Sequence, residues 1–88
     1  MAAKVEIYTS ALCGFCTAAK HLLDAKNIDY TEIDVTSDRP TRQAMKERAG
    51  GKTSVPQIFF DNVGIGGCDD LYALHNADQL DRLINPPS

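Results

Sequence analysis

The sequence predicts an α/β protein: a three-layer α/β/α sandwich around a four-stranded mixed sheet, with elements in the order β-α-β-α-β-β-α-α. Three observations lead to this prediction. Residues 4–8 and 28–35 alternate between apolar and polar side chains, and the stretch between them has a helical period. A second helical stretch follows, and then two short apolar runs flank turn residues, which predicts a hairpin. Strands joined through a helix are parallel and strands of a hairpin antiparallel, so the sheet is mixed.

Local patterns place the first half of the chain. Residues 4–8 alternate and are rich in β-branched and aromatic side chains, which predicts the first strand. Residues 14–26 carry apolar side chains at helical spacing, which we place on the inner face of a helix: Phe15, Ala18, Ala19, Leu22 and Leu23. Asn27 is expected to stop this helix, and residues 28–35 alternate again to give the second strand.

A second helix is expected after residues 36–38, which are good capping residues. Pro40 suits its first turn, where the N–H that proline lacks has no partner inside the helix. The pattern continues to about Ala49, and the pair Gly50 and Gly51 ends it.

The last third of the chain predicts a hairpin and two short helices. Residues 57–60 form the third strand, residues 61–64 provide the turn, and residues 65–66 form a short fourth strand. A helix is expected to begin at Cys68, because two aspartates follow it in the first turn. The apolar residues of the two helices are Leu71, Tyr72 and Leu74 in the first and Leu80, Leu83 and Ile84 in the second.

Length and composition limit the classes of protein that this chain can represent. Its 88 residues can bury one core, so we expect a single domain, 1–88. The three cysteines do not form the even-numbered framework of a secreted disulfide protein, and we see neither a signal-peptide pattern nor a membrane-spanning stretch. A cytoplasmic protein without membrane attachment is therefore expected. The net charge of −3 argues against a nucleic-acid partner.

The charges are unevenly distributed along the chain. Between residues 39 and 52 the only acid is Glu47, and the cations are Arg39, Arg42, Lys46, Arg48 and Lys52. Two interpretations stay open: a solvated helix face, or part of an anion-binding surface.

Two cysteines three positions apart stand at the predicted junction of the first strand and the first helix. Cys13 is expected at the amino end of that helix, where unpaired N–H groups and the helix dipole favour its thiolate, the form that attacks disulfides. Cys16 is expected one turn further on, close enough to form a disulfide with Cys13. Two buried thiols that only pack, or a zinc site completed by Cys68, His21 or His75, are the alternatives, but the spacing of a zinc finger is missing.

The chain resembles the glutaredoxin family, the glutathione-dependent branch of the thioredoxin-like fold. The resemblance covers essentially the whole chain and is to the dithiol glutaredoxins of bacterial type, although Gly14-Phe15 is closer to the Cys-Gly-Phe-Ser sequence of the monothiol, iron–sulfur-binding branch. Three motifs carry it: Cys13-Gly14-Phe15-Cys16, Thr53-Ser54-Val55-Pro56 and Gly66-Gly67-Cys68-Asp69-Asp70.

The resemblance implies a glutathione site beside the catalytic pair Cys13 and Cys16. A cis proline is expected at Val55-Pro56, with the Val55 backbone pairing with the cysteinyl part of glutathione. The γ-glutamyl carboxylate is expected on the backbone of Cys68 and Asp69, and helix-terminal N–H groups suit such an anion. The full set of implied binding residues is Phe15, Arg42, Val55, Pro56, Gly67, Cys68 and Asp69. Cys68, the third thiol, is expected to pack, with oxidation or glutathionylation as its alternative.

The expected function is glutathione-dependent reduction of protein disulfides and of glutathionylated proteins through Cys13. Glutathione is the cosubstrate, and glutathione reductase is an indirect partner. We expect a monomer with no resident metal. A third interpretation, a thioredoxin-type reductant that uses a flavoprotein reductase, is disfavoured by the anion-binding motif at Asp69.

Two departures from the family keep an alternative open. Gly14 stands where many dithiol members have proline, and members with a small residue there can bridge a [2Fe-2S] cluster between two protomers, with glutathione as outer ligand. Such a dimer would use Cys13 as its protein ligand and act as an iron–sulfur carrier or sensor. Ser10 stands where relatives often have lysine, which leaves stabilisation of the thiolate mostly to the helix terminus.

Overall fold

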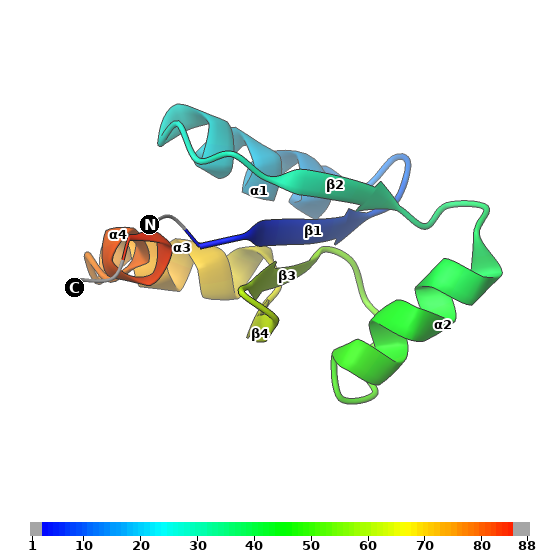
Figure 1. The fold of residues 1–88 in the computed structure, drawn as a ribbon. Coiled ribbons are helices and arrows are strands. Elements are labelled where there is room, and N and C mark those ends of the chain that lie inside the picture. Colours follow the sequence, from blue (N-terminus) through cyan, green and yellow to red (C-terminus); the bar gives the residue numbers. More distant parts are fainter. Residues whose placement is uncertain (1–2, 86–88) are drawn as a thin grey trace.

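The computed structural model describes residues 3–85, which form four strands and four helices (Figure 1). The elements follow one another in the predicted order β-α-β-α-β-β-α-α. Their bounds are β1 Val5–Thr9, α1 Gly14–Ala25, β2 Thr31–Asp34, α2 Arg39–Arg48, β3 Gln57–Phe60, β4 Val63–Gly66, α3 Cys68–Asn76 and α4 Leu80–Ile84.

The sheet is mixed, with the strand order β2-β1-β3-β4. β1 pairs in parallel with β2, and the pairs β1–β3 and β3–β4 are antiparallel. Two expected strand starts were wrong by two residues or more. β2 begins at Thr31, which pairs with Glu6, and the preceding residues 28–30 form no strand pairs. β4 begins at Val63, because Asp61 and Asn62 alone make the turn, with φ of 50° and 69° as a two-residue hairpin requires.

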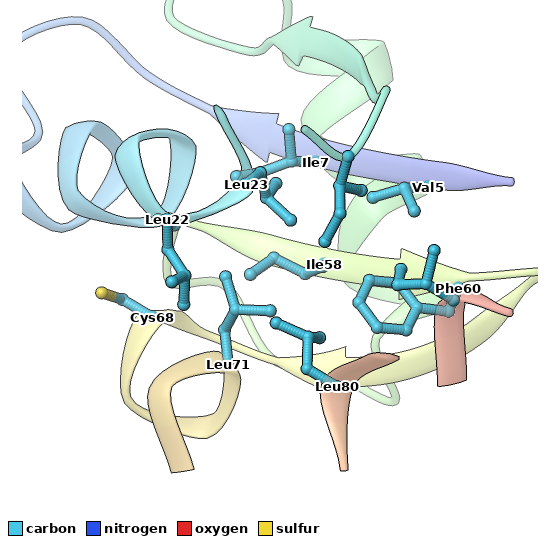
Figure 2. Close-up of a cluster of buried hydrophobic side chains, with 12 residues drawn as sticks. Val5, Ile7, Leu22, Leu23, Ile58, Phe60, Cys68, Leu71 and Leu80 are labelled. Atoms are coloured by element: carbon cyan, nitrogen blue, oxygen red, sulfur yellow. The ribbon is translucent and has the colours of Figure 1, made fainter. Parts of the chain in front are cut away.

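Helices cover both faces of the sheet and divide the core into two clusters. The larger cluster joins α1, α3 and α4 to the inner face of β1 and β3 (Figure 2). Its buried residues are Val5, Ile7, Ala19, Leu22, Leu23, Ile28, Ile58, Phe60, Cys68, Leu71, Leu80 and Ile84. The smaller cluster lies under α2 and consists of Tyr8, Val35, Met45 and Phe59. Neighbouring residues of β3, Ile58 and Phe59, therefore point into different clusters, as alternation along a strand requires.

The helix ends follow the expected capping residues. The Asp38 carboxylate accepts a hydrogen bond of 3.0 Å from the Thr41 N–H and caps α2. Gly50 and Gly51 follow α2 with φ of 68° and 99°, and Asn27 follows α1 with φ of 56°. These left-handed conformations suit glycine and asparagine, so both helix stops are confirmed.

Arg48, in the last turn of α2, ties that helix to the sheet. Its Nη2 atom lies 2.7 Å from Glu6 Oε1 on β1 and 2.8 Å from Asn62 Oδ1 in the hairpin turn. Its guanidinium also lies over the Phe59 ring, 4.0 Å from the centroid. The hydrogen bond from Arg48 lowers the pKa of Glu6 below its usual value of 4.5.

Glu6→Gln is expected to lower the free energy of unfolding at pH 7 by about 1–2 kcal/mol, because a hydrogen bond to a charged partner is weakened. A carboxyl group with a depressed pKa stabilises the fold above its unfolded pKa of 4.5, and that contribution is lost as the pH falls through the folded value. Urea unfolding from pH 7 to pH 3 should therefore show the difference shrinking below pH 4.5. Glu47→Gln, on the exposed side of α2, is the control, and a difference independent of pH would contradict the assignment.

Candidate active site

The three motifs meet at one edge of the sheet. Thr9 ends β1, Gln57 begins the antiparallel β3 opposite Tyr8, and Gly66 ends β4 opposite Ile58. The residues that follow β1, precede β3 and follow β4 therefore lie together, although up to 56 positions separate Cys13 from Asp69 in the chain. Strand order and direction create the site.

Cys13 is the N-cap residue of α1. Its Sγ atom accepts a hydrogen bond of 3.2 Å from the Cys16 N–H, and its carbonyl oxygen accepts one of 3.1 Å from the Thr17 N–H. A negatively charged acceptor forms the stronger hydrogen bond at such a helix end. Cys13 is half-buried and lines a hollow at the surface, so a substrate can approach it. The expected position of Cys13 is confirmed.

Cys16 has the opposite environment. Only 2% of its surface is exposed, and burial, followed by the neighbouring Cys13, raises the pKa of its thiol to about 11. Cys16 is therefore a protonated thiol at neutral pH, one helical turn from Cys13. The pair combines an accessible sulfur with a buried, protonated one, an arrangement suited to attack by the first and resolution by the second.

Limited alkylation checks this difference. With substoichiometric iodoacetamide at pH 7, we expect the label on Cys13 and less than about a tenth as much on Cys16 or Cys68, since the thiolate and exposure control reactivity. Burial also raises the pKa of the Cys68 thiol, which is only 8% exposed. Peptide mapping of the reduced protein measures the three sites, and equal labelling of Cys13 and Cys16 would contradict the geometry.

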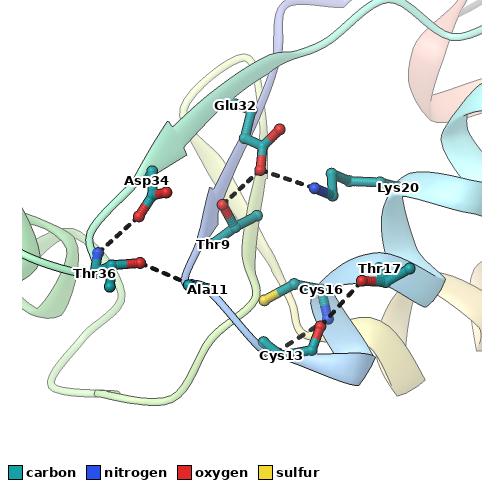
Figure 3. Close-up of polar contacts among 9 residues, drawn as sticks. All are labelled: Thr9, Ala11, Cys13, Cys16, Thr17, Lys20, Glu32, Asp34 and Thr36. Carbon is teal, nitrogen blue, oxygen red and sulfur yellow. Dashed lines mark hydrogen bonds and ion pairs between the residues drawn. The ribbon is translucent and has the colours of Figure 1, made fainter.

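The loop before Cys13 is held by β2 and the segment after it (Figure 3). The Ala11 N–H donates to Thr36 Oγ1 at 2.7 Å, and the Thr36 N–H donates to Asp34 Oδ1 at 2.8 Å. Leu12, with φ of 58°, is fully exposed in this loop. These contacts place the first residue of α1 at the sheet edge.

A hollow of about 500 Å³ lies beside the cysteines, and Ser10 and Lys20 both line it. Lys20 Nζ lies 3.0 Å from Glu32 Oε2, which also accepts a 2.7 Å hydrogen bond from the buried Thr9 hydroxyl. Both hydrogen bonds hold the pKa of Glu32 below its usual value, and the bond from Thr9 has the larger effect. Relatives often have a lysine at the position of Ser10. In this chain a lysine of α1, Lys20, lines the hollow beside the cysteines instead.

The Val55-Pro56 peptide bond is cis, as expected. The Cys13 thiol lies 3.8 Å from the Val55 carbonyl oxygen, within the distance of a sulfur hydrogen bond. Pro56 in turn adjoins the start of α3, where a Cβ atom on Gly67 would lie 3.4 Å from the Pro56 carbonyl oxygen. The second motif therefore lies between the first and the third.

Gly67 is the N-cap residue of α3. Its N–H donates to Asp70 Oδ2 at 2.9 Å, so Asp70 closes the first turn. Asp69 is exposed, whereas Cys68 is buried in the larger core cluster, which agrees with its expected packing. The remaining first-turn N–H groups have no acceptor within the helix and are available to an anion.

These elements line a groove of about 290 Å³. It brings together most of the expected binding residues: Phe15, Val55, Pro56, Gly67, Cys68 and Asp69. Phe15 was expected on the apolar inner face of α1, and that was wrong: 65% of its surface is exposed. It belongs to the first turn of α1, whose buried residues are Cys16, Ala19, Leu22 and Leu23.

Arg42 lies apart from the groove. Its Nη2 atom donates to the Thr53 carbonyl oxygen at 3.3 Å, and the side chain lines a second groove on α2. Sequence reasoning did not include Lys52, Ser54 and Gln57, which do line the first groove. The sequence gives little indication that these residues line the groove. Lys52 is one of five cations between residues 39 and 52, and Ser54 is noted only as part of the motif of residues 53–56.

Neither a membrane-spanning helix nor a cluster of metal ligands is found among residues 3–85. No helix in this part of the chain is long and apolar enough to cross a membrane. The same residues contain no group of three or more His, Cys, Asp or Glu side chains that could hold a metal ion.

Comparisons with known proteins agree with this architecture. The family model described as Glutaredoxin matches residues 5–65. A probable glutaredoxin of Synechocystis sp. is 48% identical over 85 residues, which are 97% of each chain. Glutaredoxin 3 of Escherichia coli K12 is 46% identical over 82 residues, 93% of this chain and 98% of that protein. The solution structure of glutaredoxin from Brucella melitensis superposes with a TM-score of 0.83 at 43% identity, covering 94% of this chain and 89% of that one.

The fold is thus the thioredoxin-like glutaredoxin fold, as the sequence predicts. The family model covers more than half of the chain, and the relatives match it over nearly its full length. The chain therefore belongs to the glutaredoxin family and is a glutathione-dependent thiol–disulfide oxidoreductase.

Proposed function

We propose that this glutaredoxin works as a dithiol enzyme of bacterial type, with Cys13-Gly14-Phe15-Cys16 as its active-site sequence and Cys13 as its nucleophile. One observation carries the proposal. The accessible sulfur of Cys13 lies 3.2 Å from a helix N–H and 3.8 Å from the Val55 carbonyl oxygen, which belongs to the groove. Disulfides of proteins and of glutathionylated proteins are the substrates.

The groove suits glutathione as its occupant. The first-turn N–H groups of Cys68 and Asp69 bind the γ-glutamyl carboxylate, and the exposed Asp69 carboxylate faces its α-amino group. The Val55 backbone pairs with the cysteinyl unit, which brings the glutathione sulfur to Cys13. Lys52 lines the same groove and Arg42 lies beyond Thr53, so either cation can face the glycine carboxylate.

The reaction with a glutathionylated protein takes two exchanges. The Cys13 thiolate attacks the glutathione sulfur, forming a Cys13–glutathione disulfide and releasing the protein sulfur as a thiolate that takes up a proton. A second glutathione, as its thiolate, attacks the glutathione sulfur of that adduct, releasing glutathione disulfide and restoring Cys13. For a protein disulfide, Cys13 forms the mixed disulfide and Cys16 displaces the substrate, so the Cys13–Cys16 disulfide carries the oxidation.

Intact mass spectrometry tests the nucleophile and the cosubstrate together. Incubation with glutathione disulfide should add one glutathionyl group to Cys16→Ser, and peptide mapping should place it on Cys13. Cys13→Ser should remain unmodified under the same conditions. An adduct on Cys68, or an equal adduct on Cys13→Ser, would overturn the proposal.

A glutathione-ligated [2Fe-2S] cluster is the second candidate function, and one observation favours it. A Cβ atom at Gly14 would meet no atom from the rest of the fold within 4 Å, so the space beside this residue is open. A single chain fits the cluster poorly, because Cys16 and Cys68 are buried. Cys13 of two copies, with glutathione, would have to supply the ligands.

Anaerobic reconstitution with iron, sulfide and glutathione separates the two candidates. A brown dimer that forms only with glutathione and not from Cys13→Ser supports the cluster. A colourless monomer counts against it and leaves the oxidoreductase proposal intact.

A further inference from the structure

The outer face of α2 is a basic surface with a groove in it. Arg39, Arg42, Gln43 and Lys46 occupy positions i, i+3, i+4 and i+7 of the helix and therefore share one face. Together with Thr53 they line a groove of about 320 Å³. We call this face, with Lys52 at its end, the basic face of α2.

The cations of this face have no carboxylate partners in the described part of the chain. The ion pairs among residues 3–85 join Lys20 to Glu32, Lys26 to Asp81 and Arg48 to Glu6. Arg48, the fifth cation of the stretch, is thus used within the fold. The remaining four cations belong to a protein whose net charge is −3. The charge of this face is therefore opposite in sign to the net charge of the protein.

The basic face is continuous with the active-site groove. Lys52, Ser54 and Val55 line the active-site groove, and Thr53, between them in the chain, lines the groove on α2. Val55 contacts the Cys13 sulfur through its carbonyl oxygen, and Thr53 accepts a hydrogen bond from Arg42. An extended chain covers about 3.3 Å per residue, so the two residues from Val55 to Thr53 span at most roughly 7 Å. The α-helical rise places Lys46 about 10 Å from Arg39 along α2.

We propose that the basic face of α2 binds an acidic segment of a disulfide-bonded protein substrate, beginning about two residues from the cysteine that forms the mixed disulfide with Cys13. The proposal rests on the proposed function and names its substrate class. Opposite charge in a segment leaving the active site would raise the rate of productive encounter more than the strength of binding. A protein segment fits better than nucleic acid, because the rest of the protein surface is acidic and repels a long polyanion.

Matched peptides and variants test the surface. Peptides closed by one intramolecular disulfide carry either four glutamates or four glutamines, starting two residues from one of the two cysteines, and the glutathione–cysteine disulfide is the small substrate. Arg39→Gln/Lys46→Gln removes two charges from the face and spares Arg42 and Lys52. Lys26→Gln/Arg82→Gln removes two charges from the end of α1 and from α4, at the other end of the molecule from α2 (Figure 1).

At low salt, we expect Arg39→Gln/Lys46→Gln to lower kcat/KM for the acidic peptide about three- to tenfold, since two exposed charge pairs are lost. The small substrate and the glutamine peptide should be unaffected, and so should Lys26→Gln/Arg82→Gln on every substrate. Raising the ionic strength to about 0.5 M should remove the preference, because the screening length falls well below 10 Å.

Four outcomes would overturn the proposal. These are equal kcat/KM for both peptides, equal losses in both double variants, a loss on the small substrate, or stronger competition by a single-stranded oligonucleotide than by an unmodified acidic peptide. If the small substrate is reduced and the peptides show no preference, only the docking surface fails. If no substrate is reduced, the proposed function itself fails.

Discussion

Cys13→Ser should reduce activity on glutathionylated substrates by about a thousandfold or more, because loss of a nucleophile removes the covalent route altogether. Cys16→Ser should keep this activity within about twofold, since Cys16 is 2% exposed and does not take part in the exchange with glutathione. The two variants remove the same atom one helical turn apart. Each is therefore the control for the other.

The same pair should behave differently with a protein disulfide. Cys16→Ser is then expected to stall as a mixed disulfide at Cys13, because the second thiol that displaces the substrate is missing. Coupled reduction by glutathione and glutathione reductase measures the first activity, and gel analysis under non-reducing conditions measures the second. Equal losses of deglutathionylation in both variants would refute the route through Cys13 alone.

Phe59→Ala should lower the free energy of unfolding by about 3–5 kcal/mol, the usual cost of truncating a buried aromatic side chain. Phe59 is 1% exposed, meets the Tyr8 ring edge-on at 5.8 Å between centroids, and carries the Arg48 guanidinium on its face. Its removal leaves a cavity between the sheet and α2. Urea unfolding measures the loss, which is a large part of the stability of a small domain.

Phe15→Ala is the matched control. The same atoms are removed from a side chain that is 65% exposed, so the free energy of unfolding should change by less than about 0.5 kcal/mol. Phe59→Leu keeps most of the volume and loses only the ring contacts, for which we expect about 1–2 kcal/mol. If both alanine variants lost equal stability, the sheet contact of α2 would not be as the structure has it.

Sequence reasoning succeeded where the signal is local. Cys13 caps α1, Asp38 caps α2, and both helices stop at residues that accept positive φ, because each depends on neighbours in the chain. It failed where pairing with a neighbouring strand determines which residues form a strand. Residues 28–30 alternate like a strand, yet strand pairing with β1 begins at Thr31. Helical periodicity placed Phe15 inward, although periodicity does not tell which turns of a helix other elements cover; 65% of its surface is exposed.

The cis bond at Val55-Pro56 is a feature that the local sequence alone does not predict. Only about 5–6% of X-Pro bonds in folded proteins are cis, so the local sequence alone favours trans. The expectation of a cis bond came from the resemblance to the family, and the bond is cis. The position of Arg42 outside the groove, and of Lys52 inside it, was not accessible to either kind of reasoning.

The sequence by itself determined the order of the elements, the caps, the helix stops and the chemistry of a Cys-x-x-Cys pair at a helix start. Only the tertiary structure decided that Cys13, Val55-Pro56 and Gly67–Asp69 meet, and that Cys16 is buried while Phe15 is exposed. The physical reason is that caps and periodicity depend on residues a few positions apart. The site instead depends on β3 lying antiparallel between β1 and β4, which brings three distant ends to the same edge of the sheet.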